Sequence, residues 1–235
     1  MRIILFGATG MVGQGALREC LLDPDVSEVL SIGRTPVRRT AVGPTDAKLR
    51  EQVLADPGDL SSIEGQLVGY DACFFCLGVS SVGMTEAAYR RITYDLTLAA
   101  ARTLSRLNPG MTFIYVSGAG TDSSERGRSM WARVKGQTEN ALLALPFKAA
   151  YMFRPGIIQP LHGIVSKTPL YRTFYFLLGL LVPVLRVLFP RHITTTENLG
   201  RAMLVAARRG APRPVVENIE LDALGAGTVA ATLTT

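Results

Sequence analysis

The sequence of 235 residues contains little of several features that mark particular classes of protein. Charged residues make up only 19% and hydrophobic residues 48%, which excludes an intrinsically disordered chain. Three cysteines, an odd number in a chain of this length, argue against a disulfide framework and for a reducing compartment. Two histidines without a neighbouring acidic pair predict no metal site. Since no leader pattern opens the sequence, we expect a cytoplasmic protein.

Lysine is scarce as well, because the only lysines are Lys48, Lys135, Lys148 and Lys167. The 25 Lys+Arg residues exceed the 19 Asp+Glu residues, so the net charge is +6. This excess fits a nucleic acid, a membrane surface or a phosphorylated small molecule as partner. The arginines are scattered and their longest runs are pairs, whereas a nucleic-acid surface concentrates charge on one face or tail. No nucleic-acid partner is therefore expected.

Cys73 and Cys76 form a Cys-x-x-Cys spacing inside the apolar run at residues 72–77. Successive residues of a strand alternate between the two faces of its sheet, so side chains three positions apart point to opposite faces. This pair cannot close a disulfide easily, and both cysteines are predicted to be small core residues.

Short apolar runs alternate with helical stretches along the chain, a pattern typical of parallel β-α-β units. Six such units in order predict an α/β protein with a doubly wound parallel Rossmann sheet, whose ligand lies at the carboxyl ends of the strands. Strands are expected at residues 2–6, 28–32, 49–54, 72–77, 112–116, 148–153 and 215–221. A helix is expected directly after the first strand, and two more at residues 86–105 and 129–145. A fourth is expected to begin at a capping box of Thr194 and Glu197 and to end at about residue 209.

Residues 1–221 are predicted to form a single dinucleotide-binding domain. Within it, residues 157–193 break the alternation and form a small apolar, Pro-rich insertion on the substrate side of the sheet. Residues 222–235 are mostly small and are predicted to form a flexible tail.

A glycine-rich loop follows the first predicted strand and opens the first helix. Gly7 permits a tight turn, Gly10 lets the backbone approach a pyrophosphate, and Gly13 lets the helix pack close to the strand. The helix amino terminus offers unpaired N–H groups and the positive end of its dipole to the phosphates. The predicted phosphate-binding residues are Gly7, Thr9, Gly10, Met11, Val12 and Gly13.

The end of the second predicted strand indicates which dinucleotide binds. An NAD site usually has an Asp or Glu there, which accepts a hydrogen bond from the ribose 2′-hydroxyl. This sequence has Gly33, Arg34 and Thr35 instead. The Arg34 guanidinium can donate two hydrogen bonds to a 2′-phosphate, and Thr35 and Arg38 are placed to assist. NADP(H) is therefore predicted in preference to NAD(H).

Residues after three further strands complete the predicted cofactor site. Asp56 follows the third strand and can accept a hydrogen bond from an adenine amine. Leu77 and Gly78 follow the fourth strand and are expected beside the adenine ribose and the phosphates. The residues expected beside the nicotinamide, after the sixth strand, are Pro155, Gly156 and Ile157.

With the glycine loop, Leu77-Gly78, Ser117 and Lys135-Gly136 in order, the sequence resembles the atypical short-chain dehydrogenase/reductases. More narrowly, it resembles their NAD(P)-binding epimerase/dehydratase-like and Tat-interacting-protein-like members, over roughly residues 1–209. The resemblance implies a catalytic Ser that orients the substrate, a Tyr that exchanges a proton with it, and a Lys four residues after the Tyr. This Lys lowers the pKa of the Tyr and binds the nicotinamide ribose. Ser117 matches the Ser and Lys135 matches the Lys.

Trp131 stands where the family has its tyrosine. An indole N–H only donates and does not titrate in the accessible range, so Trp131 cannot act as the general acid or base. Lys135 can still bind ribose and Ser117 can still orient a ligand. Tyr89 and Tyr94 are alternative sources of a phenol near the start of the long predicted helix.

Two functions stay open on this basis. One is an NADP-dependent oxidoreductase or epimerase-type enzyme with a modified active site, which acts on an apolar carbonyl or alcohol substrate. The other is a non-catalytic dinucleotide-binding regulatory protein that acts through a partner surface and contacts a membrane peripherally.

The insertion contains residues 174–185, which carry no charge and lie between Arg172 and Arg186. As a helix they would span about 18 Å, well short of the roughly 30 Å hydrocarbon core, so a transmembrane helix is excluded. Three interpretations stay open: a lid over the substrate, a dimer face, and a peripheral membrane contact through residues 172–191 with Arg191 as an anchor. The position after the sixth strand favours the lid. His162, also in the insertion, is a candidate substrate contact.

Overall fold

The structure is a computed structural model that describes residues 1–37, 46–164 and 193–227. Several sequence predictions fall outside the described residues. They concern Arg38, the uncharged run 174–185 and its arginines Arg172, Arg186 and Arg191.

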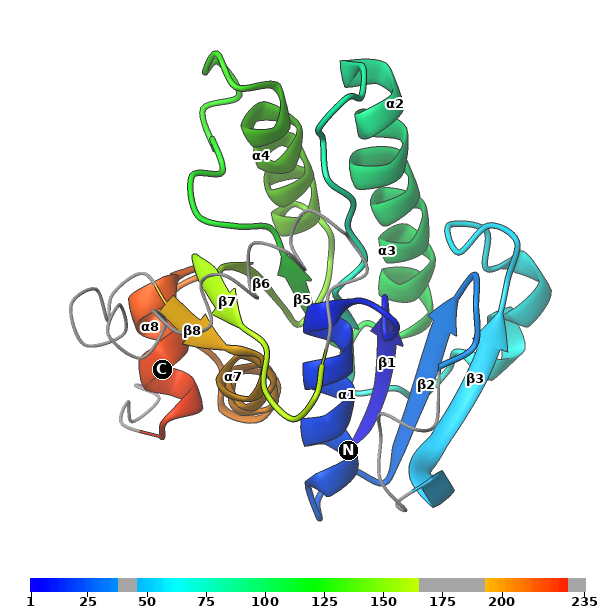
Figure 1. Ribbon diagram of the computed structural model, residues 1–235. Coiled ribbons are helices and arrows are strands. Elements are labelled where there is room, and N and C mark those ends of the chain that lie inside the picture. Colours follow the sequence, from blue (N-terminus) through cyan, green and yellow to red (C-terminus); the bar gives the residue numbers. More distant parts are fainter. Residues whose placement is uncertain (38–45, 165–192, 228–235) are drawn as a thin grey trace.

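Seven parallel strands form one sheet in the order β3-β2-β1-β4-β5-β6-β9, which confirms the predicted doubly wound Rossmann fold. The central strands are apolar and buried on both faces, as parallel sheets covered by helices require. All carboxyl ends lie at one edge of the sheet, at the upper side of Figure 1. The strands are β1 (Arg2–Phe6), β2 (Glu28–Gly33), β3 (Leu49–Val53), β4 (Ala72–Phe75), β5 (Thr112–Val116), β6 (Ala149–Arg154) and β9 (Val215–Glu217).

Helices cover both faces of the sheet (Figure 1). Side chains of β1 alternate between the two resulting cores, with Ile3 and Leu5 in one and Ile4 and Phe6 in the other. The first core includes residues of α1 (Met11–Leu22), α7 (Thr196–Arg209) and α8 (Asn218–Gly225). The second includes residues of α3 (Leu96–Leu107) and α4 (Met130–Leu143). Short 3-10 turns, η2 (Asp46–Lys48) and η3 (Ser61–Gln66), flank β3.

The helix predicted over residues 86–105 is not continuous. It consists of α2 (Glu86–Arg90), a π-helical turn η4 (Arg91–Asp95) and α3. A π-turn holds one residue more than an α-turn and releases a backbone carbonyl from the regular pattern. The carbonyl of Thr93 accepts a hydrogen bond from the Thr97 hydroxyl at 2.7 Å. The apolar spacing along this stretch is helical throughout, so the interruption could not be predicted from it.

The predicted last strand, residues 215–221, is wrong beyond Glu217, where α8 begins. Glu217 and Glu220 form a reciprocal capping box that starts this helix, and such a box stabilises a helical turn over an extended chain. The expected flexible tail is also wrong in its first part, because Asp222 lies within α8 and its side chain accepts hydrogen bonds from Thr194 and Asn198.

A small parallel sheet pairs β7 (Ile157–Gln159), at the start of the insertion, with β8 (Ile193–Thr195), at its end. The helix after it is capped by Thr195, whose hydroxyl accepts a hydrogen bond from the Asn198 N–H, so the predicted capping by Thr194 is off by one residue. Within the described parts of the chain, no helix combines the length and the apolar character needed to cross a membrane.

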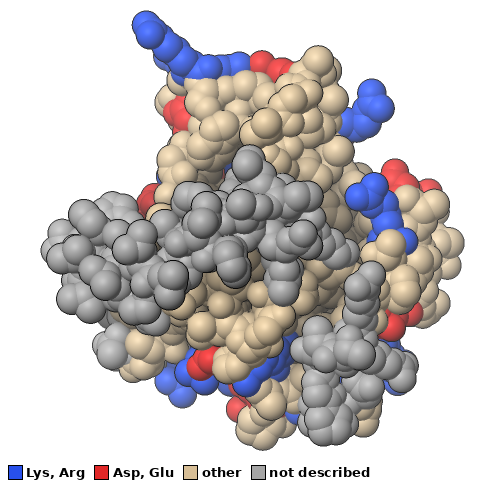
Figure 2. All heavy atoms as spheres, in the orientation of Figure 1, with Lys and Arg blue, Asp and Glu red and all other residues tan. Residues whose placement is uncertain are grey.

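Charges are balanced over most of the chain. In the view of Figure 2 the Lys and Arg side chains lie in separate places around the molecule and not in one tract. The segments 38–45 and 165–192 hold six of the 25 basic residues and none of the 19 acidic ones, so the other residues hold 19 of each sign. The net charge of +6 therefore resides in these two segments alone.

Candidate functional site

The glycine loop between β1 and α1 has the close backbone packing that the sequence predicted. Gly7 has a φ of +78°, which disfavours any residue with a side chain. A Cβ atom on Gly13 would lie 2.0 Å from the carbonyl oxygen of Gly7, so α1 can approach the loop only because Gly13 lacks one. The loop and the helix thus form one compact unit at the end of β1.

Among the described residues, no side chain caps the amino terminus of α1. Its N-cap residue, Gly10, offers no side-chain hydrogen bond, and the first turn contains no acidic residue. The first N–H groups of a helix have no partner within it, and they carry partial positive charge. This end of α1 is therefore suited to an anion such as a phosphate group.

A pocket of about 670 Å³ opens beside the loop at the carboxyl ends of β1, β2, β3 and β4. A Cβ atom on Gly78 would meet no atom within 4 Å, so the backbone there leaves open space for a ligand. The pocket brings together predicted cofactor residues from four separate stretches of sequence. They are Gly7, Thr9, Gly10, Met11, Arg34, Thr35, Asp56, Leu77 and Gly78.

Arg34 lines the pocket at the end of β2 and is exposed. Among the described residues it has no ion-pair partner, and Asp56 is the only carboxylate that lines the pocket. The loop that carries Arg34 is anchored, because the N–H of Val37 donates a hydrogen bond to the Glu51 side chain at 2.7 Å. One oxygen of Asp56 accepts from the N–H of Gly58 at 2.8 Å, which fixes the direction of this carboxylate.

Sequence reasoning missed several apolar residues of this pocket, among them Ile92 and Leu96. Ile92 belongs to the π-helical turn η4 and Leu96 begins α3. Together with Pro57 they give the pocket an apolar wall, which suits a planar base. Nothing in the sequence distinguished them from the other apolar residues of a buried helix.

Other predicted cofactor residues do not line this pocket. Val12 and Gly13 lie in α1, behind the loop. Pro155, Gly156 and Ile157 follow β6, two strands further along the same edge. The Gly156 N–H donates a hydrogen bond to the Asn218 side chain at 2.9 Å, which ties this segment to α8.

Ser117 and Lys135 meet at the end of β5. The Lys135 ammonium donates a hydrogen bond to the main-chain carbonyl of Ser117. The Ser117 hydroxyl donates to the carbonyl of Phe153 at 3.1 Å. Trp131 lies one turn before Lys135 on α4, and its indole packs beside the loop after β5, 3.5 Å from where a Cβ of Gly120 would stand. The structure therefore brings Ser117 and Lys135 into contact.

The surroundings of Lys135 disfavour its charge. Burial lowers the pKa of its ammonium to about 8, although the Glu139 carboxylate raises it in part. Glu139 is itself engaged by Arg154. The Tyr115 ring centroid lies 5.8 Å from the Lys135 nitrogen, and burial raises the pKa of this phenol. A lysine with a pKa near 8 can both hold and release a proton close to neutral pH.

The other candidate side chains have different surroundings. Tyr89 is buried in α2, and the Tyr94 ring lies under the Arg90 guanidinium at 4.0 Å. His162 pairs with Glu197 of α7. The described residues contain no cluster of three or more His, Cys, Asp or Glu side chains that could hold a metal ion.

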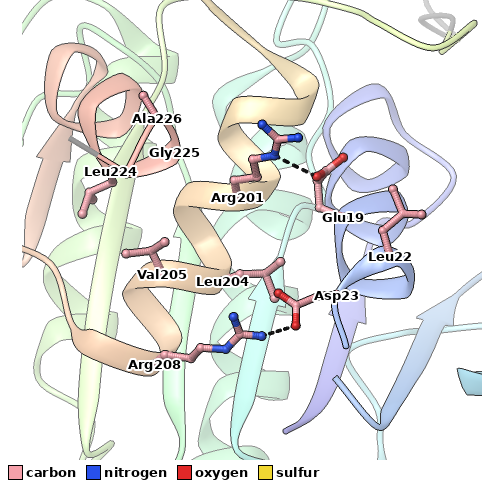
Figure 3. A pocket seen from close by; sticks show the side chains of 11 residues that line it. Glu19, Leu22, Asp23, Arg201, Leu204, Val205, Arg208, Leu224, Gly225 and Ala226 are labelled. Atoms are coloured by element: carbon pink, nitrogen blue, oxygen red, sulfur yellow. Dashed lines mark hydrogen bonds and ion pairs between the residues drawn. The ribbon is translucent and has the colours of Figure 1, made fainter. Parts of the chain in front are cut away.

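A second, shallower hollow of about 370 Å³ lies between α1, α7 and α8 (Figure 3). Ion pairs of Arg201 with Glu19 and of Arg208 with Asp23 cross it and join α7 to α1. Its lining residues lie in these helices or directly after them, and none is shared with the glycine-loop pocket.

The parallel sheet, the glycine loop and the pocket at the strand ends define a Rossmann-type α/β protein. Solved structures with the same fold support this class. WbmF of Bordetella bronchiseptica, in complex with NAD+, superposes with a TM-score of 0.68 at 14% identity, over 97% of this chain and 78% of that one. A UDP-N-acetylglucosamine 4-epimerase from Methanobrevibacter ruminantium gives 0.64 at 13% identity, over 92% and 74%.

Within this class, the chain is a homologue of the Fmp52 proteins and of HTATIP2, which confirms the predicted Tat-interacting-protein-like resemblance. It is 31% identical to fmp52-1 of Aspergillus terreus over 164 residues, which cover 67% of this chain and 66% of the relative. It is 27% identical to HTATIP2 of Rattus norvegicus over 156 residues, 66% of this chain and 62% of the relative. The matches thus span about two thirds of the relatives' lengths. No family model matches the sequence.

These relatives correct the expectation of a cytoplasmic protein, because the Fmp52 proteins are named as mitochondrial. The expectation rested on the lack of a recognisable leader pattern. Composition and hydrophobic periodicity reflect the requirements of the fold, and they do not indicate the cellular compartment.

Proposed function

We propose that this protein is an NADP(H)-dependent oxidoreductase of the short-chain dehydrogenase/reductase type that acts on an apolar carbonyl or alcohol. The proposal rests on one observation: the glycine-loop pocket and the contact between Ser117 and Lys135 lie at the same edge of the sheet. The contact lies one strand further along this edge than the pocket. A dinucleotide bound along this edge would extend from the pocket toward these two residues.

The residues present fit such a cofactor. The free end of α1 suits the pyrophosphate, and the wall that contains Ile92 suits the adenine. Lys135 would hold the nicotinamide ribose, and the bound cofactor would supply or accept a hydride. Ser117 would accept a hydrogen bond from a substrate hydroxyl, since its own proton is directed to Phe153.

The preference for NADP(H) rests on Arg34. A 2′-phosphate needs a cation at the end of β2, and Arg34 lines the pocket there without an ion-pair partner among the described residues. A carboxylate in this place would instead repel the phosphate and bind a 2′-hydroxyl. One of the solved structures with this fold is an NAD+ complex, so the fold itself does not determine which dinucleotide binds. The preference for NADP(H) is proposed for this chain alone.

The cofactor can be tested by fluorescence, because Trp131 is the only tryptophan. Quenching of its emission gives dissociation constants for NADPH and NADH. We expect NADPH to bind more tightly, and Arg34→Ala to weaken NADPH about 10- to 100-fold while leaving NADH within about threefold. Arg102→Ala, at an exposed arginine of α3, is the matched control. Equal affinities for the two cofactors in the unchanged protein would refute the preference.

Turnover separates the oxidoreductase from the alternative, a dinucleotide-binding regulator without catalysis. NADPH consumption is measured against a panel of apolar ketones and aldehydes, with Ser117→Ala as the inactive control. Turnover that disappears in this variant supports the enzyme. Micromolar NADPH binding without turnover of any substrate favours the regulator.

A peripheral membrane contact through residues 172–191 is a second proposal, and it rests on sequence. Segment 165–192 has four basic residues, no acidic one and the uncharged run 174–185, a composition that suits an anionic lipid surface. Since the fungal relatives are named as mitochondrial, we propose that this surface is a mitochondrial membrane. Co-sedimentation with anionic vesicles tests the contact. Protein that stays in solution with anionic and neutral vesicles alike would exclude it.

A further inference from the structure

The proposed reduction lacks a general acid, because Trp131 replaces the tyrosine of the family. Reduction of a carbonyl needs a proton for its oxygen, and the Trp131 indole N–H does not give up its proton in the accessible pH range. The Ser117 hydroxyl is committed as well, because both it and the Ser117 N–H donate to the carbonyl of Phe153, at 3.1 and 2.9 Å. A different group must therefore supply the proton.

Lys135 has the position and the chemistry for this task. Its ammonium has three protons, of which one is directed to the Ser117 carbonyl, so two remain for other acceptors. Among the described residues no carboxylate lies within ion-pair distance of it. The groups around it are the Glu139 carboxylate, which Arg154 neutralises, and the buried phenol of Tyr115.

We propose that Lys135 is itself the proton donor of the reaction, with Trp131 as an apolar wall in the place of the usual phenol. This inference rests on the proposed function. The carbonyl carbon accepts a hydride from the reduced nicotinamide dinucleotide, and the carbonyl oxygen accepts a proton from the Lys135 nitrogen. The π-bond of the carbonyl breaks, a C–H and an O–H bond form, and Lys135 is left as a neutral amine that regains its proton from water.

Burial makes this exchange feasible near neutral pH. An ordinary lysine holds its proton too tightly to act as an efficient acid at pH 7, whereas burial lowers the pKa of Lys135 to about 8. Trp131 supports this effect, since an indole one turn earlier on α4 adds no opposite charge to the site.

The first test reads the amine itself, without turnover. Competitive acetylation from pH 6 to 11, followed by mass spectrometry, gives the titration midpoint of each lysine. With only four lysines, exposed Lys148 serves as the reference within the same chain. We expect Lys135 to titrate with a midpoint of about 8. Midpoints that coincide would overturn the inference, whether or not a substrate is found.

The second test separates proton transfer from binding of the ribose. Lys135→Arg keeps a cation that cannot give up its proton, so the affinity for NADPH should stay within about threefold while kcat falls about 100-fold or more. Lys148→Arg is the matched control. Adding Trp131→Tyr to Lys135→Arg restores the phenol and should recover turnover in part.

If Lys135→Arg alone retains full kcat, Lys135 acts only in binding and the inference is wrong. If the unchanged protein has no turnover at all, the proposed function fails. The acetylation midpoint of Lys135 is measured without turnover, so the two failures can be distinguished.

Discussion

Glu139 has no exposed surface and lies against the guanidinium of Arg154, which it contacts through both carboxylate oxygens. The pair joins the middle of α4 to the end of β6, and Arg154 also reaches Glu217 at 3.3 Å. Since Lys135 lies one turn before Glu139, the pair fixes the helix that carries the candidate proton donor.

Removal of Arg154 should destabilise the protein strongly. Arg154→Met leaves the Glu139 carboxylate buried without a partner, and we expect a loss of about 3–5 kcal/mol in the free energy of unfolding. Urea denaturation measures this loss. Arg106→Met is the control, because its pair with Glu64 is largely exposed and is worth at most about 1 kcal/mol. Similar losses in the two variants would contradict the structural importance of the buried pair.

Gly13→Ala should disrupt the glycine-loop pocket. The new Cβ would stand 2.0 Å from the Gly7 carbonyl oxygen, so α1 must move away from the loop. We expect a loss of about 2 kcal/mol or more in stability and of at least about tenfold in dinucleotide affinity. Gly65→Ala, where a Cβ meets no atom within 4 Å, is the comparison and should leave binding unchanged. A Gly13→Ala protein with full affinity would show that the close packing is unnecessary.

The stability of the protein should change with pH through Lys135. Below about pH 8 the ammonium is charged in both the folded and the unfolded chain, so the cost of burying it is fully present. Between about pH 8 and 10.5 the folded lysine has lost its proton while the unfolded one keeps it, and stability rises with pH. Relative to Lys135→Met, the unchanged protein should gain up to about 3 kcal/mol over this range. Lys148→Met provides the baseline, and a pH-independent difference for Lys135→Met would contradict the buried charge.

Thr195→Ala should weaken the start of α7. The Thr195 hydroxyl accepts a hydrogen bond from the Asn198 N–H at 3.0 Å, and the loss of such a cap costs about 1 kcal/mol. Ser129 occupies the same position at the start of α4 but makes no cap hydrogen bond, so Ser129→Ala should change stability by less than about 0.5 kcal/mol. Thermal unfolding of the two variants measures the difference, and equal effects would argue against the cap.

Local patterns explain which parts of the fold were predictable. The strands around β1 are continuous apolar runs between turn residues, and the glycine loop has a spacing that few other structures require. The start of α8 was not predictable, because Val215 to Leu221 reads equally well as a strand until the capping box of Glu217 and Glu220 decides it. The role of Ile92 in the pocket depends on a π-turn that helical periodicity does not encode.

The π-turn of residues Arg91–Asp95 makes the number of residues in this stretch as important as their identity. Successive residues of an α-helix are rotated by about 100°, and the extra residue of the π-turn absorbs one such step, so deletion of one residue here would restore a regular α-turn without rotating α3. Leu96 and the buried Thr97 of α3 would then keep their faces, whereas Ile92, which lies within the turn and lines the pocket, would shift. A single-residue gap in this stretch would thus remodel the apolar wall of the pocket at Ile92 without altering any residue of the glycine loop.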